Sequence, residues 1–82
     1  MIYPVATAVQ PLEQNQLLVT FDNGERRIYD AKPLIKGAWF GKLRDKALFN
    51  TVHIAFPSVA WDGGQDIAPD ELYCASKPIS AM

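Results

Sequence analysis

The sequence contains very few of the residues that build metal centres and covalent crosslinks. Among its 82 residues there is one cysteine, Cys74, and one histidine, His53. A single cysteine excludes an intramolecular disulfide and a cysteine-based zinc site. Because small secreted domains usually depend on disulfides, the lone thiol indicates a reducing compartment, and we expect a cytoplasmic protein. We expect neither a bound metal nor a cofactor.

Long apolar segments are also missing. The longest uninterrupted apolar runs span only three or four residues, such as Val59-Ala60-Trp61, whereas a membrane-spanning helix needs about 20. The N-terminus lacks the basic and apolar segments of a secretion signal. We therefore expect no membrane association.

What the chain does contain is typical of one globular domain. It is 49% hydrophobic with a net charge of −1, which argues against intrinsic disorder and against a strongly basic nucleic-acid-binding protein. Its length favours a single domain over residues 1–82 with one modest core. Within it, residues 77–82 are expected to form a loose C-terminal tail.

Turn signals and alternation predict most of the strands. Residues 5–10 alternate and predict a strand that ends at Pro11. Residues 16–21 and 25–30 flank Asp22-Asn23-Gly24, the strongest hairpin signal in the chain. A three-residue loop is favoured over a two-residue one, because the shorter loop would place Asp22 opposite Glu25. Residues 51–56 and 59–62 predict two further strands.

Two segments carry helical signals. Between residues 37 and 50 apolar residues recur three and four apart, but Gly41 weakens the pattern, so one helix or two short turns are possible and we expect two, with Asp45 as a cap. Pro69 and the acids after it predict a terminal helix. The expected fold is therefore α+β, with a mainly antiparallel sheet of about five strands, the order β-β-β-α-β-β-α and short helices packed on the sheet.

No catalytic pattern is present. The chain has no phosphate-binding loop, no nucleophile motif and no calcium loop, so we expect a protein that is not an enzyme. An alternative is a small-molecule-binding or minor enzymatic domain with a polar pocket formed by three residues, namely His53, Trp61 and Asp66.

The charges are segregated along the chain. Residues 1–25 sum to −3, residues 26–46 to +5 and residues 47–82 to −3. If the basic part forms one face, it can meet an acidic partner or, less plausibly, a nucleic-acid backbone; spread over separate surfaces, these charges only keep the domain soluble. Basic and aromatic residues together form the candidate interaction surface, which consists of Arg26, Arg27, Trp39, Phe40, Lys42 and Arg44.

Several segments together resemble the small bacterial family of domains of unknown function numbered 2442. The most specific is the closing segment, with Trp61, Gly64, Asp66-Ile67-Ala68-Pro69 and Leu72-Tyr73. The resemblance implies a compact α+β domain that is often a separate cytoplasmic protein. In some relatives it precedes a DNA-binding helix-turn-helix, and others are encoded beside a second small protein in a toxin–antitoxin-like arrangement. It supplies no catalytic residues.

The sequence therefore favours a non-catalytic interaction or regulatory module. The expected partner is a small protein, in an antitoxin-like role, or a second copy of the chain. Nucleic-acid contact through residues 26–46 is a weaker alternative.

Overall fold

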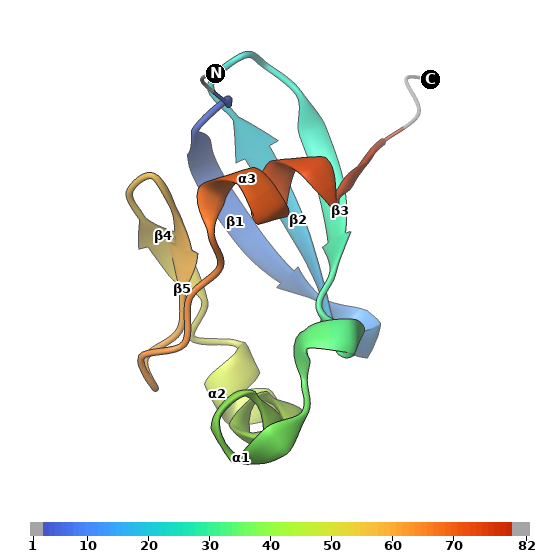
Figure 1. Ribbon diagram of the computed structural model, residues 1–82. Coiled ribbons are helices and arrows are strands. Elements are labelled where there is room, and N and C mark those ends of the chain that lie inside the picture. Colours follow the sequence, from blue (N-terminus) through green and yellow to red (C-terminus); the bar gives the residue numbers. More distant parts are fainter. Residues whose placement is uncertain (1–2, 80–82) are drawn as a thin grey trace.

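The computed structural model describes residues 3–79 and has an α+β fold (Figure 1). Four strands form an antiparallel sheet in the order β1-β2-β3-β6, and two more form a separate antiparallel pair. The strands are β1 (Ala6–Leu12), β2 (Gln16–Phe21), β3 (Arg26–Asp30), β4 (His53–Ala55), β5 (Ser58–Ala60) and β6 (Lys77–Pro78). The helices are α1 (Gly37–Phe40), α2 (Lys46–Phe49) and α3 (Pro69–Cys74), with short 3-10 turns η1 (Glu13–Asn15), η2 (Lys32–Leu34) and η3 (Gly41–Arg44). The predicted fold class is confirmed, with the expected sheet divided into two.

The β2–β3 hairpin has the predicted three-residue loop. The amide of Phe21 donates to the Glu25 carbonyl at 2.8 Å, and Gly24 adopts a φ of +89°. Leu17 therefore lies opposite Tyr29. This register pairs apolar residues across the two strands, and it keeps the carboxylates of Asp22 and Glu25 from facing each other.

The prediction that Pro11 ends the first strand is wrong. β1 continues to Leu12, and Pro11 lies opposite Leu17 of β2. β1 is an edge strand of its sheet. A proline is tolerated there because its missing N–H can face away from the partner strand.

The helical middle of the chain is broken, as predicted. α1 continues directly into η3, and the chain then extends at Asp45 before α2 begins. The Asp45 carboxylate accepts a hydrogen bond from the Ala47 amide at 3.0 Å and so caps α2. These short helices lie at the end of the molecule opposite the β2–β3 loop (Figure 1).

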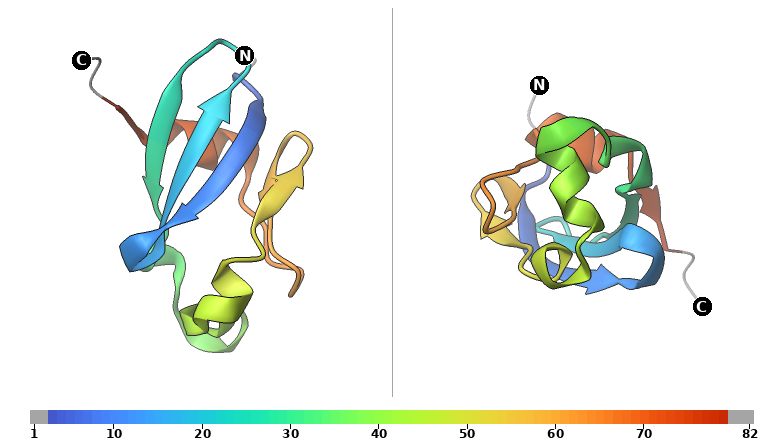
Figure 2. Two further views of the ribbon diagram at one scale, coloured as in Figure 1. Left: turned by 180° about the vertical axis from the view of Figure 1, so that it is seen from behind. Right: turned by 90° about the horizontal axis from the view of Figure 1, so that it is seen from below.

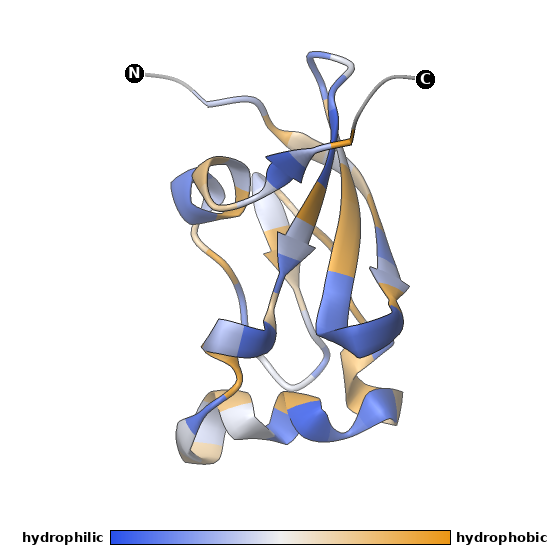
Figure 3. Ribbon diagram, turned by 90° about the vertical axis from the view of Figure 1, so that its right-hand side faces the viewer, coloured by the Kyte–Doolittle hydropathy of each residue, from blue (hydrophilic) through white to orange (hydrophobic). Residues whose placement is uncertain are grey.

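The core lies between the larger sheet and the elements that cover it. α3 crosses one face of that sheet, as the front and back views show (Figures 1 and 2). Hydrophilic and hydrophobic residues alternate along its strands, because successive side chains point to opposite faces (Figure 3). The largest contributors to the core are Leu17, Val19, Phe21, Tyr29, Leu43, Phe49, Val59, Trp61, Ile67 and Leu72.

β4 and β5 form a small ribbon beside β1. The segment after β5 joins it, since Asp66 forms a bridge with Ala60 and the Ile67 amide donates to the Val59 carbonyl at 3.3 Å. Val59 and Ile67 are buried. By strand alternation, Ala60 and Asp66 therefore point to the opposite, outer face of the ribbon.

The first three residues of the predicted loose tail are hydrogen-bonded to the larger sheet. Lys77 and Pro78 form β6, which pairs with β3, and the amide of Ile79 donates to the Arg26 carbonyl at 3.0 Å. The rest of the predicted tail, residues 80–82, lies outside the described residues. Between residues 3 and 79, none of the helices is long and apolar enough to cross a bilayer.

Candidate interaction site

The structure does not bring the predicted basic and aromatic surface together. Arg26 and Arg27 open β3, next to the β2–β3 loop, whereas the other members lie on α1 and η3 beyond the far end of β3 (Figure 1). Arg26 and Arg27 also point to opposite faces of the strand, since they are consecutive residues. The charge segregation along the chain therefore does not become one continuous basic face.

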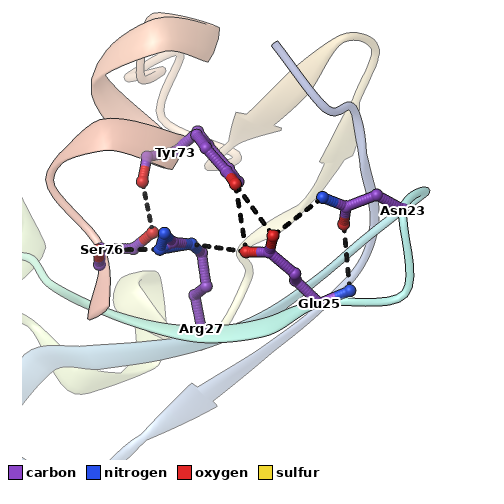
Figure 4. A network of polar contacts seen from close by, with 5 residues as sticks. All are labelled: Asn23, Glu25, Arg27, Tyr73 and Ser76. Carbon is purple, nitrogen blue, oxygen red and sulfur yellow. Dashed lines mark hydrogen bonds and ion pairs between the residues drawn. The ribbon is translucent and has the colours of Figure 1, made fainter. Parts of the chain in front are cut away.

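Arg27 belongs to an internal network (Figure 4). Its side chain is only 14% exposed, with Nε 3.2 Å from the Glu25 carboxylate. Its guanidinium lies 4.3 Å from the ring centroid of Tyr73, whose hydroxyl donates to the same carboxylate at 3.0 Å. Asn23 donates to Glu25 as well, at 3.0 Å. This network ties the hairpin to α3, so Arg27 contributes to packing rather than to an open surface.

Trp39 and its neighbours form a separate small patch. Trp39 is 50% exposed, and the Lys42 ammonium lies 5.3 Å from the centroid of its ring. Phe40 differs from the prediction, because it packs against the core. Lys42 and Arg44 are exposed.

The predicted polar pocket does not form around Trp61. Its side chain is buried at 2% exposure, and its indole Nε1 donates to the Phe49 carbonyl at 2.9 Å. A residue committed to the core in this way cannot line a surface pocket. The interpretation that placed Trp61 in a binding site is therefore wrong.

The other two members of that pocket lie on the outer face of the ribbon but serve different contacts. His53 Nδ1 lies 2.9 Å from the Thr51 carbonyl and 3.6 Å from the Asp62 carboxylate. His53 and Asp66 are separated by Ala60, which pairs with both of them. The Asp66 side chain has no hydrogen bond or ion pair with any residue that the structure describes.

Asp66 instead lines a different hollow, of about 330 Å³, between the β4–β5 turn and the start of α3. Small residues on the outer face of the ribbon contribute to its wall, and the turn lies at one side. The lining residues are Ala55, Phe56, Pro57, Ser58, Val59, Asp66, Ile67, Ala68 and Pro69. We call this feature the ribbon hollow.

The ribbon hollow combines three kinds of chemistry. Phe56, in the turn, is 81% exposed, which is far more than the other exposed large apolar residues among those described. Asp66 supplies an exposed carboxylate. Ser58 is 3% exposed, and its Oγ has no hydrogen-bond partner within residues 3–79. The hollow can therefore take an apolar group and a cation.

The sequence pattern did not identify Phe56 or Ser58. The predicted strand over residues 51–56 included Phe56, but β4 ends at Ala55 and Phe56 lies in the turn. A usable signal was present in the following Pro57, because a proline commonly marks a turn rather than a central strand.

A second, smaller hollow lies between β3 and α3. Its volume is about 250 Å³, and Tyr29, Asp30 and Glu71 are among the residues that line it. Burial and the neighbouring Glu71 carboxylate raise the pKa of Tyr29 to about 12. Burial tends to raise the pKa of Asp30, but hydrogen bonds and charge from Lys32 outweigh it and leave this pKa below its ordinary value.

The described residues hold no group of three histidine, cysteine, aspartate or glutamate side chains placed to bind a metal ion. Cys74 is exposed. Ser58 lacks the neighbouring base that would activate a serine nucleophile.

Comparison with known proteins gives one match. No curated protein and no solved structure matches the chain. A family model described as "Protein of unknown function (DUF2442)" matches residues 6–78, which run from the first residue of β1 to the last residue of β6. The chain therefore belongs to the DUF2442 family, as its closing segment predicted.

Proposed function

We propose that this domain is a non-catalytic module that binds a protein partner. The observation that carries the proposal is the exposure of Phe56, at 81%, in the β4–β5 turn. An aromatic side chain left in water gives up the stabilisation that burial would provide, of about 1.5–3 kcal/mol. Exposed aromatic residues are also common in the centres of protein interfaces.

The polar groups support a binding role over a catalytic one. His53 contacts the Thr51 carbonyl and the Asp62 carboxylate. Among the described residues, no hydrogen bond joins it to Ser58 or Cys74. General acid–base or nucleophilic catalysis requires a base within hydrogen-bond reach of the reacting group. None of these side chains is arranged in that way.

The finer form of the proposal is an antitoxin-like role, in which the module holds a small partner protein. This form is based on the family resemblance, because some relatives are encoded beside a second small protein, and on the exposed aromatic surface. Self-association through the same surface is the other form.

Site-specific photocrosslinking tests the proposal. A benzophenone amino acid replaces Phe56 or Trp39 in separate variants, and replaces Glu13 of η1, which is exposed and polar, in the control. We expect a discrete crosslinked species of fixed mass from position 56 or 39 and none from position 13. Equal, diffuse crosslinking from all three positions, together with a monomer in light scattering, would contradict the proposal.

A further inference from the structure

We infer that the ribbon hollow docks a partner segment in which an apolar side chain lies next to lysine or arginine. The inference rests on the proposed function and adds to it a location and a partner chemistry. Three features of the hollow carry it, namely its apolar side, its free carboxylate and its unpartnered hydroxyl.

The apolar side comes from the turn and from the start of α3. Phe56 is 81% exposed and Pro57 is next to it in the turn, while Ala68 and Pro69 lie across the hollow. Between them the wall is lined by the small side chains of Ala55 and Ser58. A space of about 330 Å³ bounded in this way admits one inserted side chain and part of its backbone.

The charge of the hollow is negative and is not neutralised locally. Asp66 is exposed and forms no ion pair with residues 3–79. The C-terminal part of the chain, residues 47–82, has a net charge of −3 and holds one basic residue, Lys77. Lys77 lies on β6, where its charge acts on Asp30. A cation on the partner therefore meets a carboxylate without a competing partner.

Ser58 gives the second, independent indication of a ligand. Its hydroxyl is buried and lacks a hydrogen-bond partner in the part of the chain that is described. Leaving a buried polar group unpaired costs about 1–3 kcal/mol. Ser58 is one of the residues that line the hollow, so a partner backbone that enters the hollow can supply the missing hydrogen bond.

The competing occupant is a second copy of this chain. Its α1–η3 patch presents Trp39 beside Lys42, which is also an apolar and basic combination. Such a contact closes into a dimer only if both copies make it at the same time about a two-fold axis, and otherwise it leads to rings or filaments. We therefore favour a segment of another protein.

The experiment uses random dodecapeptides displayed on phage, selected against the whole domain and counter-selected against the Phe56→Ser variant. Selected sequences are synthesised, and their binding is mapped by NMR on the ¹⁵N-labelled protein. We expect an enriched motif with leucine, methionine or an aromatic residue within two positions of arginine or lysine. Amide shifts should concentrate in residues 55–58 and 66–69.

Matched variants give the decisive comparison. Phe56→Ala should weaken peptide binding at least about tenfold, as expected for a central aromatic contact. Asp66→Asn should weaken it about two- to fivefold in low salt, as expected for an exposed ion pair. Asp62→Asn removes the same charge outside the hollow and should leave binding unchanged, whereas exchanging the peptide's basic residue for glutamate should weaken binding more than Asp66→Asn does.

Each other outcome overturns the inference in an identifiable way. Selection that yields no peptide, an acidic motif, or shifts confined to α1 and η3 removes the hollow as the docking site. Concentration-dependent oligomers that Phe56→Ser dissolves would assign the hollow to a second copy. The failure of the proposed function is distinguishable from this, because it would also require that photocrosslinking at position 39 captures no partner.

Discussion

The indole ring of Trp39 lies directly against the backbone of Gly64. A Cβ atom at residue 64 would lie 3.3 Å from both Cη2 and Cζ2 of that ring, and the φ of Gly64 is +95°. Next to it, Gln65 Nε2 donates to the Trp39 carbonyl at 2.9 Å. These contacts attach α1 to the turn that follows β5. They explain why a glycine is needed at residue 64, in the segment that carries the family resemblance.

We therefore expect Gly64→Ala to destabilise the domain by about 2–3 kcal/mol. About 1–2 kcal/mol of this comes from placing a Cβ in the left-handed region, and the rest comes from displacing the Trp39 ring. Urea unfolding followed by tryptophan fluorescence measures the change. The matched control is Gly24→Ala, because Gly24 has a similar φ of +89° but nothing within 4 Å of its added Cβ. Equal losses in the two variants would mean that the Trp39 contact contributes nothing.

Arg27→Ala should lower the free energy of unfolding by about 2 kcal/mol. It removes the ion pair with Glu25, whose side chain is 39% exposed, and the stacking on Tyr73 of an Arg27 side chain that is only 14% exposed. The control is Arg26→Ala, since Arg26 is exposed on the other face of β3 and should change stability by less than about 0.5 kcal/mol. If both variants behave alike, the network in Figure 4 does not stabilise the fold.

The pKa of Tyr29 predicts a loss of stability at alkaline pH. It is raised to about 12 from the ordinary 10.0 by burial and by the charge of Glu71. A raised folded-state pKa contributes stability that is complete below pH 10 and disappears as the pH rises towards 12. The Tyr29→Phe variant cannot ionise at this position. Urea unfolding at several pH values should therefore show the wild-type protein losing stability relative to Tyr29→Phe across this range, and parallel curves would contradict the assignment.

Local signals predicted the parts of the fold that depend on neighbouring residues. The loop around Gly24 fixed the β2–β3 register, and Asp45 and Pro69 marked the starts of α2 and α3. Pro11 misled the prediction because its tolerance depends on the position of β1 at the sheet edge, which the sequence of that segment does not contain. The pairing of Lys77 and Pro78 with β3 is likewise a tertiary contact.

The candidate site was less predictable than the fold. Strand alternation could have separated Arg26 from Arg27, but the burial of Arg27 depends on α3, which follows more than 40 residues later. The ribbon hollow depends on residues 66–69 returning beside β5, which no local pattern indicates. Composition and charge therefore led to the hypothesis of a binding module, while the location of the exposed aromatic residue came from the tertiary structure.

Phe56→Ser should leave the free energy of unfolding within about 0.5 kcal/mol of the wild-type value, because its side chain is already 81% exposed in the folded protein. The contrasting variant is Phe49→Ser, since Phe49 is 2% exposed and packs against Trp61 with ring centroids 5.8 Å apart. That change should cost at least about 3 kcal/mol. Urea unfolding measures both. A large loss for Phe56→Ser would show that this side chain stabilises the domain itself, and its exposure could then no longer be explained by a partner.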